Sequence, residues 1–156
     1  NLDPNLIVPN QIRLEEVTRD TVSAVCKLDA GDEGKQVAPN AVSIAQAHFQ
    51  GEAWFRAVYH DELLVGFLML YDPTLVERAD EPDFFLWRLM IDKSHQGKGY
   101  GRAAVEALVE HVRTRPGAQR LLEVGSGVGA QTEILLRRFP DLHTTCVDLN
   151  DAQLDA

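Results

Sequence analysis

Three long apolar stretches in the middle of the chain predict the centre of a β-sheet. Residues 53–59 and 63–71 are separated by only three polar residues, a spacing typical of an antiparallel hairpin. The stretch 63–71 has apolar residues on both faces of a strand, so it predicts a central strand. The stretch FFLWRLMI at 84–91 has the same character and predicts another buried strand.

Helical periodicity and helix-ending residues place the other elements around these strands. Apolar residues recur every four positions at Tyr100, Ala104, Leu108 and Val112, and they predict a helix after Gly99 with one side on the core. The order β-α-α-β-β-β-α-β-α-β predicts a mixed α/β layer fold in one domain. We expect an N-terminal arm at 1–10 and one domain at 11–156. The other expected elements of this domain are a strand at 12–17, a helix from Thr18 or Asp20 to about Leu28, a helix at about 40–49, a strand at 120–124, a helix at about 130–139 and a strand at 143–149.

Composition narrows the class of protein. At 156 residues, 45% of them hydrophobic, the chain has the size and character of one globular domain. Its net charge of −9 argues against nucleic acid as a partner, because phosphate binding needs a basic patch. No apolar stretch is long enough to cross a membrane, and the first ten residues do not look like a secretory signal. Cys26 and Cys146 form no metal-spacing motif, so we expect a cytoplasmic protein with two free thiols and no bound metal.

A glycine-rich turn, HQGKGYGRAA at 95–104, follows the buried strand 84–91 and precedes a predicted helix. Glycines at 97, 99 and 101 allow a tight turn and let a ligand approach the backbone. The first N–H groups of the helix have no intrahelical partner, and with the helix dipole they favour an anion. Lys98 and Arg102 add positive charge. The turn therefore predicts an anion-binding site; a glycine-rich turn without a ligand is the alternative.

The stretch LWRLMIDKSHQGKGYGR resembles the acyl-CoA loop of the GNAT acyltransferase superfamily. The order of elements from about residue 11 to 118 is also similar to that family. The resemblance implies a mostly antiparallel central sheet with flanking helices, a splayed pair of strands at the cofactor site, and acetyl-CoA as cofactor. It also implies a pantetheine-binding edge at Leu89, Met90 and Ile91, and a pyrophosphate cradle made of Gln96, Gly97, Lys98, Gly99, Tyr100, Gly101 and Arg102.

Within that superfamily, the same stretch looks most like the branch that acetylates polyamines and other small amines. The resemblance implies an N-acetyltransferase with a small amine as its substrate. The net charge of −9 and the acidic loop Asp80, Glu81 and Asp83 favour a cationic acceptor, with a plain solvated loop as the alternative. The sequence leaves the oligomeric state open, with a homodimer as one alternative.

Two carboxylates are candidate catalytic residues. An amine must be neutral before it attacks a thioester, so a base or a chain of waters has to remove its proton. Asp92 and Glu123 each stand at the end of a predicted strand, where we expect the cleft. For both residues, a solvated or loop-capping carboxylate is the alternative.

A second glycine turn, LLEVGSGVGA at 121–130, resembles the first motif of class I S-adenosylmethionine-dependent methyltransferases. Glu123, Gly125, Gly127, Gly129 and Asp148 carry this resemblance. Only one β-α-β unit follows Leu121, whereas a doubly wound nucleotide domain needs two halves. We therefore expect no S-adenosylmethionine binding. The atypical segment 119–156 then completes the acetyltransferase sheet; a fragment of a methyltransferase fusion and a site completed by a partner are the alternatives.

The same segment departs from the acetyltransferase pattern in one respect. Members of the resembled branch usually carry a tyrosine on the helix after the fifth strand, where it protonates the departing CoA thiolate. The stretch TEILLRRFPDL at 132–142 has no tyrosine, and Leu136 or Phe139 lies in that region. A CoA-binding module without catalysis is therefore the alternative to an enzyme.

Overall fold

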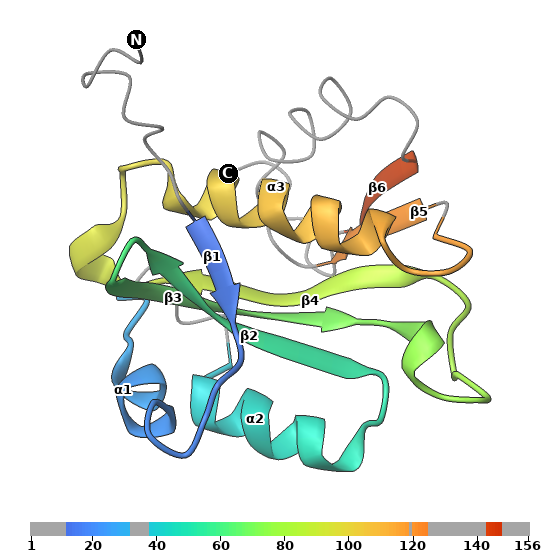
Figure 1. The fold of residues 1–156 in the computed structure, drawn as a ribbon, viewed down its shortest axis with the longest axis horizontal. Helices are drawn as coiled ribbons and strands as arrows, with labels where there is room; N and C mark the ends of the chain where they lie inside the picture. The colour runs from blue at the N-terminus through green and yellow to red at the C-terminus, as the bar shows by residue number, and fades with distance from the viewer. Residues whose placement is uncertain (1–11, 32–37, 119, 125–142, 148–156) are drawn as a thin grey trace, which may run out of the picture.

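A computed structural model describes residues 12–31, 38–118, 120–124 and 143–147. The strands form one six-stranded sheet in the order β1-β2-β3-β4-β5-β6 within these residues (Figure 1). The elements are β1 (Ile12–Glu15), α1 (Val22–Lys27), α2 (Asn40–Phe49), β2 (Ala53–His60), β3 (Leu63–Tyr71), the short 3₁₀ helix η2 (Pro73–Leu75), β4 (Phe84–Ile91), the 3₁₀ helix η3 (Lys93–His95), α3 (Tyr100–Arg113), β5 (Arg120–Val124) and β6 (His143–Val147).

The sheet is antiparallel from β1 to β4, while β5 pairs parallel to β4 and β6 parallel to β5. This confirms the mixed, mostly antiparallel sheet with flanking helices. The predicted bounds of α2, β3, β4 and β5 are confirmed. The first strand was predicted too long, since β1 ends at Glu15, and α1 begins later than predicted because residues 18–21 form a turn held by the Thr18 carbonyl.

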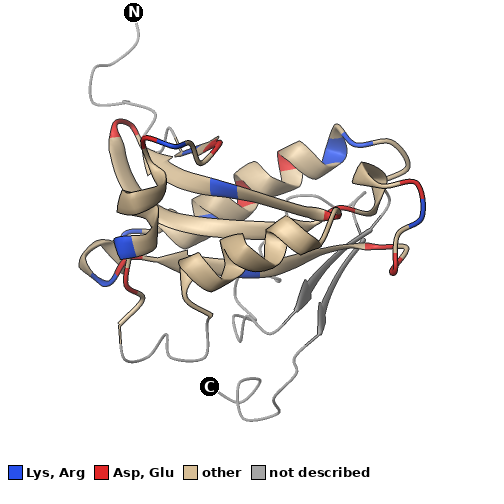
Figure 2. Ribbon diagram, turned by 90° about the horizontal axis from the view of Figure 1, so that it is seen from below, with Lys and Arg blue, Asp and Glu red and all other residues tan. Residues whose placement is uncertain are grey.

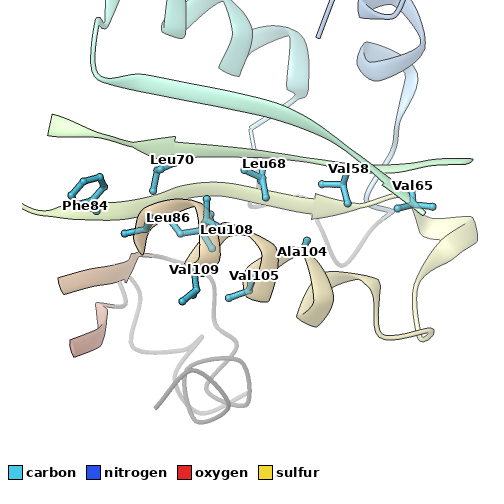
Figure 3. Close-up of a cluster of buried hydrophobic side chains, with 11 residues drawn as sticks. Val58, Val65, Leu68, Leu70, Phe84, Leu86, Ala104, Val105, Leu108 and Val109 are labelled. Carbon is cyan, nitrogen blue, oxygen red and sulfur yellow. The ribbon is translucent and has the colours of Figure 1, made fainter. Parts of the chain in front are cut away.

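Helices cover both faces of the sheet. α3 lies across one face, and α1 and α2 lie on the other (Figure 1). Under α3, side chains from β2, β3 and β4 meet those of the helix in a buried cluster (Figure 3). Leu108 lies fully buried in this cluster, as the four-residue apolar stripe predicted. α3, which follows the glycine turn, therefore packs on β4, the strand that leads into it.

On the opposite face, Val25, Ala57, Phe67 and Met69 form a second buried cluster under α1 and α2. The Asn40 side chain is buried at the start of α2, and its Nδ2 donates to the Val25 carbonyl at 2.9 Å. This bond satisfies a buried polar group and joins α2 to α1.

β4 contains a β-bulge at Trp87. Met69 of β3 stands opposite Arg88, but the next residue, Leu70, stands opposite Leu86, so Trp87 is an extra residue in β4. An inserted residue breaks the alternation of faces. Trp87 packs in the cluster under α2, and Arg88 bonds to Gln46 of α2, so both side chains lie on the same face.

β5 pairs with β4 only along Phe84–Leu86. Beyond the bulge, the edge of β4 that faces away from β3 has no strand partner among the described residues. The described pairing of β4 with β5 ends where the bulge lies, and the splayed pair of strands stays a prediction.

The predicted arm at 1–10, the helix at about 130–139, the second glycine turn at 125–129 and Asp148 all lie outside the described residues. In the described part of the chain, no helix combines the length and the apolar character needed to cross a bilayer. Cys26 is a free, exposed cysteine.

Leu108→Ala should lower the free energy of unfolding by about 2–5 kcal/mol, since it removes a fully buried side chain from the cluster under α3. Leu75→Ala is the matched control: Leu75 is 42% exposed, so the same change should cost much less. Urea unfolding followed by circular dichroism measures both. Equal losses would show that the packing of α3 does not hold the sheet as described.

Candidate functional site

The chain makes a glycine turn between β4 and α3. Gly97 and Gly99 have φ angles of 79° and 85°, in the left-handed region that favours glycine. A Cβ atom built on either residue would meet nothing within 4 Å. The outer side of the turn is therefore open, and a ligand can reach its backbone directly.

The backbone amides of this turn are available to an anion. The first hydrogen bond of α3 runs from Ala103 N–H to the Gly99 carbonyl at 3.1 Å. The amides of Tyr100, Gly101 and Arg102 come before this bond and have no acceptor within the helix, as expected at a helix N-terminus. Lys98 and Arg102 are exposed beside them, although Arg102 also lies 3.7 Å from Glu106. Together these groups form a positive end for α3 that suits a phosphate.

Gln96 supports the turn from behind. Its side-chain Nε2 donates to the carbonyls of Ile91 at 2.9 Å and Ala30 at 3.0 Å. The side chain thus joins the end of β4 to the segment after α1. This contact gives Gln96 a positioning role in the cradle that was predicted from the sequence.

Asp92 caps the turn. One carboxylate oxygen accepts from the Asp29 amide at 2.8 Å, and the other accepts from the amide and hydroxyl of Ser94. Burial raises the pKa of Asp92, but the hydrogen bonds from Ser94 and Asp29 outweigh it and hold the pKa below its ordinary value. A general base near neutral pH needs a raised pKa, so the geometry favours the loop-capping alternative for Asp92.

The segment that follows α1 is fastened to this turn by further bonds. The Lys93 amide donates to the Asp29 carbonyl at 2.7 Å, and the Lys93 ammonium lies 3.2 Å from the Asp29 carboxylate. Hydrogen bonding from the Gly31 amide, and then the contact with Lys93, lowers the pKa of Asp29. Residues 29–31 and 92–96 are therefore held together as one unit.

The predicted pantetheine edge, Leu89–Ile91, forms the last part of β4 and runs directly into the turn. Glu123 lies in β5, opposite Leu86 of β4 and Cys146 of β6. It therefore stands where the pairing of β4 and β5 ends. The position of its side chain is outside what the structure describes, so its role as a base stays a prediction.

Tyr100 uses its side chain for packing. Its hydroxyl lies 3.3 Å from Nδ1 of His60, and the two rings are 4.7 Å apart. His60 ends β2 at the tip of the β2–β3 hairpin. The contact fixes the first turn of α3 on this hairpin, which leaves the backbone of Tyr100 for a ligand.

The acidic loop precedes β4, at the end of the sheet opposite the glycine turn, and acidic positions gather along it (Figures 1 and 2). Its Asp80 amide donates to the buried carboxylate of Glu52 at 3.3 Å, and the Tyr71 hydroxyl donates to the same carboxylate at 2.9 Å. The bond from Tyr71 is the main cause of the lowered pKa of Glu52. These contacts hold the loop, with its Asp80 and Glu81, against the sheet.

Sequence reasoning did not single out Arg88. It is half-buried on the α2 face, where its Nη2 donates to Gln46 Oε1 at 3.2 Å and its Nη1 donates to the Trp87 carbonyl at 3.2 Å. The signal was present, because Arg88 is the only charged residue in the apolar stretch FFLWRLMI.

Comparison with known families gives a match to the acetyltransferase (GNAT) family over residues 23–133. The match spans more than half of the chain. It includes the glycine turn at 96–101 and also the second glycine turn at 125–129. No curated protein matches the chain.

Solved structures show the same fold at low sequence identity. An acetyltransferase from Thermus thermophilus is 17% identical with a TM-score of 0.53, covering 83% of this chain and 87% of its own. A mutant of KacT is 19% identical with a TM-score of 0.55, covering 83% and 86%. A ribosomal-protein-alanine N-acetyltransferase from Brucella melitensis biovar Abortus 2308 is 14% identical with a TM-score of 0.50, covering 92% and 84%.

Asp92→Asn should lower the free energy of unfolding by about 1 kcal/mol at pH 7, because the amide cannot accept all the bonds that the carboxylate accepts. The folded pKa of Asp92 lies below its ordinary value of 3.8, so the ionised group stabilises the protein above about pH 4. That stabilisation is lost as the pH falls through the folded pKa. The difference between wild type and variant should therefore shrink on acidification, as measured by urea unfolding from pH 7 to 3.

Asp20→Asn, at an exposed position before α1, is the control and should change stability little at either pH. If Asp92→Asn left stability unchanged but lowered kcat by the hundredfold or more that removal of a general base can cost, the capping role would be wrong.

Proposed function

We propose that the acceptor of this chain, which belongs to the acetyltransferase (GNAT) family, is a small amine that carries positive charge. Family membership makes the chain an acetyltransferase and acetyl-CoA its acetyl donor. The observation that carries the proposed site is the continuous path from the unpaired edge of β4 into the open glycine turn.

In the proposed arrangement, the CoA pyrophosphate binds the amides of residues 97–102 at the start of α3. The left-handed Gly97 and Gly99 support this, since no side chain covers the backbone there. The pantetheine arm pairs with the free edge of β4 along Leu89–Ile91. The thioester then lies one step further along the strand, beside the bulge at Trp87.

The proposed reaction is direct transfer. The amine nitrogen attacks the thioester carbon, the tetrahedral oxyanion accepts a hydrogen bond from a backbone N–H of β4, and the C–S bond breaks to release CoA thiolate. The attacking nitrogen loses a proton, and Glu123 remains our candidate for the base that takes it. Asp92 holds the turn in shape, and the released thiolate takes a proton from solvent.

A cationic acceptor is supported by charge. The chain carries a net charge of −9, and the acidic loop lies at the end where β4 begins, away from the cofactor turn. A field of this sign raises the local concentration of cations and repels anions. The chain's similarity to the polyamine-acetylating branch points the same way.

Two alternatives from other classes make different predictions. A CoA-binding module without catalysis is favoured by the missing tyrosine at 132–142, and it would bind acetyl-CoA without releasing free thiol in the presence of any amine. A methyltransferase fragment would bind S-adenosylmethionine. Calorimetry with acetyl-CoA, CoA and S-adenosylmethionine, combined with a thiol-release assay, separates all three.

Gly99→Val should weaken acetyl-CoA binding at least tenfold, or by about 1.4 kcal/mol, because a branched side chain would cover the amides of the turn. Calorimetry measures the effect. Gly117→Val is the matched control, since Gly117 also has a positive φ and an open Cβ position but follows the far end of α3. Both variants strain the backbone, so wild-type affinity in Gly99→Val, or equal weakening in the two, would contradict the proposed cradle.

A panel of acceptors tests the charge of the substrate. Spermidine and lysine should be acetylated with higher kcat/KM than neutral amino acids such as alanine, since the acidic chain concentrates cations. Thiol release is measured at low and high salt, and screening should reduce the preference. A preference for neutral or acidic acceptors would show that the proposed substrate class is wrong.

A further inference from the structure

Arg88 projects from the bulge of β4 toward α2. Its guanidinium lies 5.6 Å from the centroid of the Trp87 ring and bonds to Gln46. Its Nε is buried and has no hydrogen-bond partner in the described part of the chain. A buried donor without a partner costs free energy, so each such group needs an explanation.

A second arginine in the same sheet shows what is missing at Arg88. Arg56 of β2 is also half-buried, its Nη1 also donates to the preceding carbonyl, and its guanidinium also lies over a tryptophan, Trp54, at 4.2 Å. The two arginines differ in their counter-charge. The carboxylate of Glu16 acts on Arg56, whereas no described carboxylate pairs with Arg88.

Arg88 lies next to the place where we expect the thioester of the bound cofactor. If pyrophosphate lies at the glycine turn and pantetheine along Leu89–Ile91, the thioester lies beside Trp87 and Arg88. The Arg88 side chain then stands on the α2 side of the reacting carbonyl, within one side-chain length of it. This step rests on the proposed function.

We propose that Arg88 binds a carboxylate of the acceptor, so that the substrate is an amine that also carries a carboxylate, such as a diamino acid. The planar guanidinium can hold a carboxylate with two parallel hydrogen bonds, because Nη1 and Nη2 each keep a second N–H beside their bonds to the Trp87 carbonyl and Gln46. The Trp87 ring and Gln46 keep the guanidinium in place. The acidic loop attracts the cationic group of such a substrate, and Arg88 binds its carboxylate.

Three acceptors with the same amine chain test this proposal. Lysine carries the carboxylate, lysinamide replaces it with a neutral amide, and cadaverine lacks it. Wild type should prefer lysine by about ten- to hundredfold in kcat/KM, the usual effect of a hydrogen bond to a charged group. Equal use of the three acceptors, or a preference for lysinamide or cadaverine, would overturn the proposal.

Arg88→Met keeps the aliphatic stem and removes the charge, and it should abolish the preference for lysine chiefly through KM. Arg88→Lys keeps the charge without the two-pronged geometry, so its preference should be intermediate. Arg56→Met is the matched control on the opposite face, under α3, and should retain the wild-type preference. The melting temperature and the Kd for acetyl-CoA show that each variant is folded; an unchanged preference in both Arg88 variants would also overturn the proposal.

Failure of this proposal can be told apart from failure of the proposed function. If all three amines are acetylated alike, amine acetylation stands and the role of Arg88 falls. If none is acetylated, calorimetry of lysine and lysinamide on the enzyme–CoA complex decides. Lysine binding that is preferred over lysinamide and lost in Arg88→Met would support the carboxylate site alone, and its absence would overturn both.

Discussion

An inserted residue disrupts the hydrogen-bond ladder of a strand locally, and β4 has such a residue at Trp87. Before the bulge, β4 pairs with β3 and β5; after it, β4 pairs with β3 alone among the described strands. The described pairing with β5 ends at this inserted residue, which also turns Trp87 and Arg88 toward the same helix. The edge proposed for the cofactor and the arginine proposed for the acceptor have one structural origin.

The net negative charge of the chain opposes binding of an anionic cofactor, and the local structure of the glycine turn offsets this repulsion. CoA is an anion and the chain carries a net charge of −9, so the molecule as a whole repels its cofactor. Repulsion between exposed charges is largely screened beyond about 8 Å at physiological salt. The amides at the start of α3, with Lys98 beside them, act at contact distance and are hardly screened. The acidic loop lies at the other end of β4, where it opposes cofactor binding least.

Much of the fold could be predicted because its signals are local. Long apolar stretches defined β3 and β4, and the glycine turn was recognisable from its place between a buried strand and a periodic helix. The bulge could not be predicted, since a stretch with a single charged residue, Arg88, has no alternation that an inserted residue would visibly break. Asp92 and Gln96 each have one partner, Asp29 or Ala30, that lies 63 or 66 positions earlier in the chain, so part of their supporting roles depends on tertiary packing. For the same reason, Asp92 resembled a catalytic carboxylate in the sequence.

The bonds between residues 29–31 and 92–96 give the cofactor turn a mechanical connection to the α1 side of the molecule. A ligand that shifts one segment must shift the other or break these bonds. Linkage between two sites is reciprocal: whatever factor cofactor binding applies to the affinity for a ligand of residues 29–31, that ligand applies to the affinity for the cofactor. A change at residues 29–31 would therefore alter the affinity for the cofactor without touching the cofactor itself.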